Sequence, residues 1–139
     1  MLDGDALRDV LGAEGAHTRS DRLELAFRYA KLCRLISVQG IDVAMATISL
    51  FKEIHEWNRG NLSGYCEILL TAPLSELALR DPKKIYERAA RGEIANVAGV
   101  DLAVDMPESP DLEIAFEPGL TPEAAVERVM AFLELDTVE

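Results

Sequence analysis

The feature that most constrains this fold is the alternation of short apolar runs with amphipathic segments. The run 41–48 (IDVAMATI) is apolar almost throughout and follows Gly40, which predicts a strand buried on both faces. The runs 65–71 (YCEILLT) and 112–116 (LEIAF) predict two further strands. Because amphipathic segments separate these runs, we expect an α/β domain with a parallel sheet.

Helices are predicted between the strands. The longest should span residues 21 to about 39, with Ser20 as its N-cap and Gly40 at its end. Shorter helices are expected over 6–11 with Asp5 as N-cap, over 50–59, over 74–80, and from Pro122 to about 135 with Thr121 as N-cap. The first two residues are too few to make a strand, so the strand that should precede the Asp3-Gly4-Asp5 turn is expected to be cut short.

Length and charge limit the classes of function. A chain of 139 residues predicts one domain. Its 14 Lys and Arg against 25 Asp and Glu give a net charge of −11, which argues against nucleic-acid binding. Cys33 and Cys66 lie in apolar runs without a CxxC pattern, which predicts buried thiols and no metal site. The acidic N-terminus and the absence of a long apolar run predict a cytoplasmic protein that binds no membrane.

The triplet Asp3-Gly4-Asp5 and the nearby Arg8 form the first candidate site. One carboxylate could accept a proton from a substrate hydroxyl or orient Mg²⁺, and Arg8 could bind an anion. Alternatively, the triplet is only a turn with a helix N-cap, and Arg8 is solvated.

Ser49 follows the predicted strand 41–48, a position from which a hydroxyl can contact substrate. It could equally be the N-cap of the helix over 50–59. His17 falls in a predicted loop and His55 in a predicted helix, so a hydrolase triad is not indicated.

The stretch 80–101 (RDPKKIYERAARGEIANVAGVD) has the densest mixture of charges. Composition favours a solvated helix with ion pairs. However, a basic helix followed by a turn at Asn96 and Gly99 is also typical of a lid that closes on an anionic ligand.

Five segments occur in an order and spacing that resemble the adenylylsulfate kinase (APS kinase) family: DGDALRDVLG, SDRLEL, ISLFKE, RDPKKIYERAARGEIANVAGVD and PESPDLEI. The resemblance extends from Asp3 to about Ile114. It implies a P-loop-kinase-like fold, a three-layer parallel sheet flanked by helices, in a single domain over 1–139 with its lid at about 80–101. The implied reaction transfers the γ-phosphoryl group of ATP, with Mg²⁺, to the 3′-hydroxyl of adenosine 5′-phosphosulfate. Family members are commonly homodimers.

The resemblance also implies roles for individual residues. Asp3 or Asp5 would lie near the acceptor hydroxyl and the metal, and Ser49 would lie beside the substrate. Arg8 and Arg22 would bind the sulfonucleotide. The lid positions that close over the nucleotides are Lys83, Asn96 and Gly99.

The sequence departs from the family pattern in one major respect. The family has a strand and a GxxGxGK[ST] loop before the DGD turn, and the 139 residues contain no such motif. We therefore expect this chain alone to be inactive. It is either the major part of a kinase or a non-catalytic sulfonucleotide-binding or interaction module. Since the missing strand is central in the family, strands 41–48 and 65–71 should pair directly or accept a strand from another chain. Leu25 and Ala95 replace the usual Asn and Lys.

Overall fold

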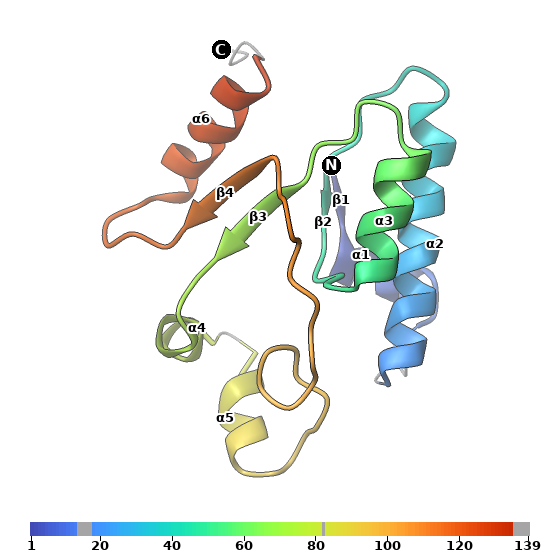
Figure 1. Cartoon of the computed structure of the whole chain (residues 1–139). Helices are drawn as coiled ribbons and strands as arrows, with labels where there is room; N and C mark the ends of the chain where they lie inside the picture. The colour runs from blue at the N-terminus through green and yellow to red at the C-terminus, as the bar shows by residue number, and fades with distance from the viewer. Residues whose placement is uncertain (14–17, 82, 135–139) are drawn as a thin grey trace. The chain divides into compact units, whose positions relative to one another are not determined.

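A computed structural model describes residues 1–13, 18–81 and 83–134. The chain divides into two compact units (Figure 1). The first comprises Met1–Tyr65 and Arg88–Pro107, and the second comprises Cys66–Glu87 and Glu108–Glu139. Each unit contains its own two-stranded parallel sheet.

In the first unit, β1 (Leu2–Asp3) pairs with β2 (Met45–Ala46), with Leu2 opposite Met45. The prediction that the first residues are too few to form a strand is therefore wrong, because a ladder partner stabilises them. The prediction of a fully buried strand over 41–48 is also wrong. The side chain of Ile41 is 55% exposed and that of Ile48 is 72% exposed. Because β1 offers two residues for pairing, the apolar run forms a strand over two residues only.

The helices of the first unit are α1 (Gly4–Val10), α2 (Arg19–Ser37) and α3 (Lys52–Asn61). The N-cap of α1 is Asp3 and not Asp5, because the Asp3 carboxylate accepts from the Ala6 N–H. Phe51 precedes α3 without a side-chain cap, so the interpretation of Ser49 as N-cap is wrong.

Helix α2 begins earlier than predicted. Its N-cap is Thr18 rather than Ser20, because Thr18 and Asp21 form a reciprocal capping box. It is the longest described helix, and no helix in the described part of the chain is long and apolar enough to cross a membrane.

The core of the first unit lies along one face of α2, which packs against α1 and α3 (Figure 1). Ala26 on this helix meets Phe51 and Ile54 in a buried cluster. The rings of Phe27 and Trp57 pack edge to face beside it, with centroids 6.3 Å apart. The buried face of α2 consists of Leu25, Ala26, Tyr29, Ala30 and Cys33. Burial of the Cys33 thiol is confirmed, whereas Cys66 is only partly buried.

In the second unit, β3 (Ile68–Thr71) pairs in parallel with β4 (Leu112–Ala115). Helix α4 (Leu74–Arg80) follows β3. Helix α5 (Ile85–Ala90) comes next in the chain, and the division between the two units falls within it, after Glu87. Helix α6 (Pro122–Phe132) is preceded by Thr121, whose hydroxyl accepts from the Ala124 N–H, so the predicted N-cap and N1 pair is confirmed.

The predicted direct pairing between the segments 41–48 and 65–71 would join the two units, and it stays a prediction. Strand β2 pairs with β1, and β3 pairs with β4. Each of the strands β2 and β3 has a hydrogen-bonded partner strand in its own unit, so one edge of each strand is paired. The alternative, a strand supplied by another chain, stays a prediction.

Candidate anion-binding site

The candidate site begins where β1 ends and α1 starts, at the Asp3-Gly4-Asp5 turn. Asp3 Oδ1 accepts from Ala6 N at 2.9 Å, and Asp5 lies in the first turn of α1. Gly4 is buried, and a Cβ at this position would lie 3.1 Å from both Ala46 O and Thr47 Oγ1. Gly4 therefore lets the acidic turn approach the end of β2.

Two hydroxyl groups lie just beyond β2. Thr47 Oγ1 and Ser49 Oγ are 2.9 Å apart and share a hydrogen bond. Because Thr47 also adjoins Gly4, Ser49 is linked through Thr47 to the acidic turn. The carboxyl ends of both strands in this unit thus carry polar side chains, which is where parallel sheets bind ligands.

Arg8 of α1 and Arg22 of α2 bring two guanidinium groups to the site. The Nε atoms of both are buried and have no hydrogen-bond partner among the described residues. Burial lowers the pKa of Arg22, the positive charge of Arg8 lowers it further, and Asp101 raises it. Two neighbouring like charges with unsatisfied donors cost free energy, and an anion would satisfy both. The pair therefore has the chemistry of an anion site.

Tyr29 of α2 contacts the acidic turn. Its side chain is 4% exposed, and its hydroxyl donates to Gly4 O at 2.8 Å. Burial raises the pKa of Tyr29, and the positive charge of Arg8 lowers it. The negative charges of Asp5 and Asp3 also act on the hydroxyl. Tyr29 is thus the neighbour that the acidic turn and Arg8 have in common.

A loop that begins at Asn96 is attached to Arg22. Arg22 Nη2 donates to Asn96 O at 2.8 Å. Asn96 has a positive φ of 63°, which Asn tolerates better than most residues. The Asp101 carboxylate accepts from the N–H groups of Asn96 and Val97, and these bonds hold the pKa of Asp101 below its usual value. Asp101 therefore fixes the loop that presents a carbonyl group to Arg22.

The structure brings most of the predicted site residues together, but not all. Asp3, Asp5, Arg8, Arg22, Ser49 and Asn96 belong to the first unit and are connected as described. Gly99 also belongs to this unit, where its φ of 77° permits a turn closed by its N–H to Leu102 O. Lys83 belongs to the second unit and is exposed.

Other basic side chains form ordinary surface interactions. Arg28 pairs with Glu24 at 2.6 Å, and the Arg80 guanidinium lies over the Phe116 ring. The ion pairs in the stretch 80–101 include Lys84–Glu87, Arg88–Glu93 and Arg91–Glu93. The expectation of a charged segment with ion pairs is confirmed, although α5 itself spans only six residues.

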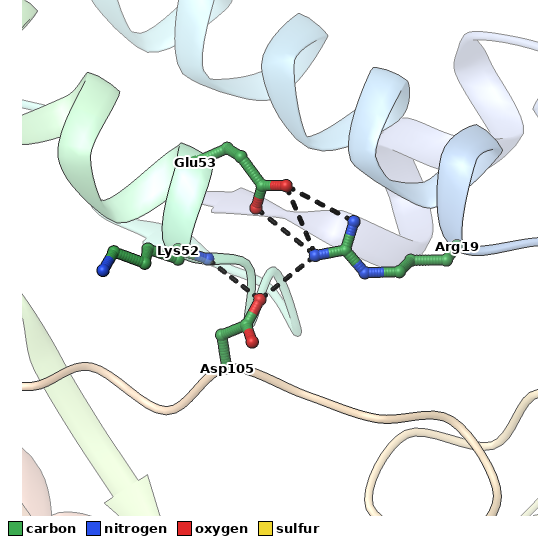
Figure 2. Close-up of polar contacts among 4 residues, drawn as sticks. All are labelled: Arg19, Lys52, Glu53 and Asp105. Atoms are coloured by element: carbon green, nitrogen blue, oxygen red, sulfur yellow. Dashed lines mark hydrogen bonds and ion pairs between the residues drawn. The ribbon is translucent and has the colours of Figure 1, made fainter.

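A second polar cluster attaches the segment before Pro107 to the helices of the first unit (Figure 2). Arg19 Nη2 lies 3.3 Å from Glu53 Oε1 and 3.1 Å from Asp105 Oδ2. The same Asp105 oxygen accepts from Lys52 N at 3.2 Å, at the start of α3. This cluster connects three segments that are distant in sequence.

Three residues of the site were not identified from the sequence: Tyr29, Thr47 and Asp101. Tyr29 occurs in an apolar stripe of a helix, a pattern that is typical of core residues. Thr47 is the one residue with a side-chain hydroxyl in the run 41–48, and that hydroxyl near the end of a predicted strand was an available signal. Asp101 could not be singled out, because its role depends on the turn that folds it back onto Asn96.

The carboxylates of the acidic turn could supply only part of the coordination shell of Mg²⁺. Magnesium in kinase sites is usually bound by one or two carboxylates together with substrate phosphates. Asp3 and Asp5 could provide such a carboxylate. The described residues contain no group of three or more His, Cys, Asp and Glu side chains that could hold a metal without phosphates.

Comparison with solved structures defines the fold. A Mycobacterium tuberculosis APS kinase, solved in complex with AMPPNP and APS, matches with a TM-score of 0.86 and 30% sequence identity. The match covers 96% of this chain and 78% of that chain. The protein therefore has the P-loop kinase fold, and the predicted fold class is confirmed.

The family model for adenylylsulphate kinase matches residues 1–115. The chain belongs to the adenylylsulphate kinase family, which confirms the resemblance found in the sequence.

Curated relatives in this family differ in the substrates that their names state. The chain is 43% identical over 108 residues to the cytidine diphosphoramidate kinase of Campylobacter jejuni, covering 78% of this chain and 63% of that protein. It is 33% identical over 136 residues to the adenylyl-sulfate kinase of Pseudomonas aeruginosa, covering 96% of this chain and 69% of that protein. It spans 18% of the bifunctional enzyme NodQ of Rhizobium sp. (strain BR816), at 38% identity.

Proposed function

We propose that this chain provides the acceptor-nucleotide site of a kinase, with Arg8 and Arg22 binding the anionic group of the acceptor. The observation that carries this proposal is the pair of buried Nε donors on α1 and α2 that have no hydrogen-bond partner among the described residues. A guanidinium group is well suited to sulfate and phosphate, because its donors match two oxygens at once.

The acidic turn and Ser49 supply the remaining chemistry. Asp3 or Asp5 would accept the proton of the attacking hydroxyl or help to hold Mg²⁺, and Ser49 would contact the acceptor. Phosphoryl transfer depends mainly on positioning and on neutralisation of charge, which agrees with a site built from carboxylates and arginines. When bound, Mg²⁺ and ATP would supply the neutralising charge and the phosphoryl group.

Adenosine 5′-phosphosulfate is the first candidate acceptor, with its 3′-hydroxyl as the group that is phosphorylated. Family membership and the matching sequence segments support it. The second candidate is cytidine diphosphoramidate, which is supported by the 43% identity to the C. jejuni kinase. Leu25, which replaces the usual Asn of the family, lies one helical turn after Arg22 on α2 and favours a changed acceptor.

The 139 residues contain no GxxGxGK[ST] motif to bind the ATP phosphates. We therefore propose that this chain alone binds the acceptor but does not transfer the phosphoryl group. It would act either with a P-loop segment from elsewhere or as a non-catalytic binding or interaction module. The segment 80–101 would serve as the lid of a single domain, and its attachment to Arg22 through Asn96 supports this role. We also propose that the chain forms a homodimer, as the resemblance to the family implies.

The test is isothermal titration calorimetry of the 139-residue chain with adenosine 5′-phosphosulfate, cytidine diphosphoramidate and ATP. We expect one of the two acceptors to bind and ATP to bind much more weakly. Arg22→Met should weaken acceptor binding by about tenfold or more, because a charged hydrogen bond is lost. Arg28→Met is the matched control, since it removes the same charge from the exposed face of the same helix.

Equal effects of the two substitutions would contradict an anion site at Arg22. Transfer of phosphate from ATP to either acceptor at about 1–100 s⁻¹ would contradict the proposed inactivity of the isolated chain. If the chain binds neither acceptor, the proposed function is wrong.

A further inference from the structure

Arg22 is held by a turn that lies far from it in the sequence. Its Nη2 atom donates to the main-chain oxygen of Asn96 at 2.8 Å, whereas its buried Nε atom has no hydrogen-bond partner among the described residues. An arginine side chain has several rotatable bonds, and fixing them costs entropy. The contact with Asn96 therefore restrains the guanidinium before an anion arrives, provided that the turn itself is rigid.

The turn at residues 96–102 is closed by its own main chain. The Val97 oxygen accepts from three N–H groups, at 3.0 Å from Val100 N, 3.2 Å from Asp101 N and 3.1 Å from Leu102 N. The side chain of Val97 is buried, and the whole turn belongs to the first unit. These bonds close the turn but leave the N–H groups of its first two residues to other acceptors.

Asp101 supplies those acceptors. Its Oδ2 accepts from Asn96 N at 2.8 Å, and its Oδ1 accepts from Val97 N at 2.5 Å. The Asn96 oxygen and the Val97 N–H belong to one planar peptide group and point in opposite directions, so a bond at the N–H also fixes the direction of the oxygen. Asp101 and Arg22 therefore bind the two ends of the same peptide group.

We propose that Asp101 is a positioning residue of the acceptor site, which orients Arg22 toward the anion through the peptide group between Asn96 and Val97. This inference rests on the proposed function, because the side chain that is positioned is one of the two arginines of the anion site. The Asn96 oxygen takes one of the five N–H donors of the guanidinium, so donors remain for the oxygens of an anion.

The backbone at Asn96 shows why the turn needs this support. Asn96 has a left-handed φ of 63°, a conformation that most side chains disfavour. The two hydrogen bonds to the Asp101 carboxylate stabilise it, because they hold the N–H groups on both sides of the Asn96 α-carbon. Loss of the carboxylate should therefore let the Asn96 oxygen turn away from Arg22.

The test uses Asp101→Asn and the matched control Asp111→Asn. Asp111 also accepts a main-chain N–H, that of Glu67 at 2.7 Å, but it belongs to the second unit. Calorimetry is done with adenosine 5′-phosphosulfate and with cytidine diphosphoramidate, at a temperature where circular dichroism shows both variants to be folded. We expect Asp101→Asn to weaken acceptor binding by about two- to tenfold, the effect of one hydrogen bond, and Asp111→Asn to leave it unchanged.

A double-mutant cycle with Arg22→Met tests whether Asp101 acts through the arginine. If it does, Asp101→Asn should weaken binding little further in the Arg22→Met background. Equal factors in both backgrounds would indicate a general effect on the fold and would overturn the proposal. Tighter acceptor binding by Asp101→Asn would also overturn it, because the Asn96 oxygen would then be a competitor of the anion for Arg22.

Amide exchange in the wild-type chain gives a readout that needs no variant. If the peptide group stays between Asp101 and Arg22 in the complex, the amides of Asn96 and Val97 should keep or gain protection when the acceptor is added. Loss of their protection on binding would mean that the anion displaces the turn, and the positioning role would be rejected.

The outcomes distinguish this inference from the proposed function. If Arg22→Met weakens binding more than its control Arg28→Met while Asp101→Asn has no effect, the anion site stands and the role of Asp101 is rejected. If the wild-type chain binds neither acceptor, both proposals fail.

Discussion

Arg22 Nη2 donates to the main-chain oxygen of Asn96 over 2.8 Å and so joins α2 to a loop 74 residues further along the chain. The loop thereby contacts one of the two arginines of the anion site. An anion that competes for the donors of Arg22 would change this contact, and a loop that moves away would release a donor to the anion. Acceptor binding and loop position are therefore expected to be coupled through Arg22.

Asp101→Asn tests how this loop is held. The carboxylate of Asp101 accepts two main-chain N–H groups through its two oxygens, whereas Asn has only one oxygen to offer. The hydrogen bonds lower the pKa of Asp101, so its contribution to stability is present above its ordinary pKa and is lost as pH falls through the lowered value. We expect Asp101→Asn to be less stable than wild type at pH 7 and the difference to shrink in strong acid.

The measurement for Asp101 is urea unfolding across a pH series, followed by circular dichroism. A stability difference that stays constant from neutral pH to strong acid would show that the carboxylate charge is not involved.

Gly4→Ala should destabilise the first unit. The added Cβ would lie 3.1 Å from the main-chain oxygen of Ala46, which cannot move without disturbing β2. Overpacking of this kind costs about 1–3 kcal/mol. Thermal unfolding of the variant would measure the loss.

Gly60→Ala is the matched control for Gly4→Ala. Gly60 lies within α3 with nothing near the position of its Cβ, so alanine should stabilise that helix by about 0.5–1 kcal/mol. Stability changes of the same sign in the two variants would contradict the proposed close approach at Gly4.

Asp105→Ala should loosen the cluster in Figure 2 by about 1 kcal/mol, since it removes one exposed ion pair and one bond to the N–H of Lys52. Glu53→Ala should cost less, because Arg19 keeps its contact with Asp105. Raising the salt concentration should reduce the ion-pair part of both effects. Chemical unfolding at low and high salt would measure them, and a larger cost for Glu53→Ala would contradict the central position of Asp105.

Thr18→Ala should cost about 1 kcal/mol by removing the capping box of α2. Ser20→Ala, at the position predicted from the sequence, should have little effect. The stabilities of both variants by thermal unfolding would decide which residue caps the helix.

Local sequence signals predicted helices better than their caps. The sequence around α2 contains two suitable caps, and the structure uses Thr18 because Asp21, three residues later, can return a hydrogen bond. Ser20 has Leu23 at the equivalent position, which cannot. Likewise, Asp3 rather than Asp5 caps α1, because its side chain reaches the N–H of Ala6.

Contacts between distant segments limited the prediction of strands and of the site. The run ending at Ile48 is apolar enough for a buried strand, but the length of a strand depends on its partner, and β1 provides two residues. Arg8 and Arg22 could be selected from the sequence because they match family segments. The link from Arg22 to Asn96 and the bond from Tyr29 to Gly4 could not, because the participants meet only after folding.

The parallel pairing of β3 with β4 has a consequence for the rate of folding. Glu67 and Asp111, which meet just before the paired residues, are 44 positions apart, so the chain must close a long loop before this sheet gains its first hydrogen bond. Closing a long loop is costly in entropy, and structures that depend on such contacts fold slowly. The hydrogen bonds of a helix, in contrast, join residues that are close in sequence. We therefore expect α2 to acquire protection from amide exchange early in refolding and Leu69 and Leu70 to acquire it late.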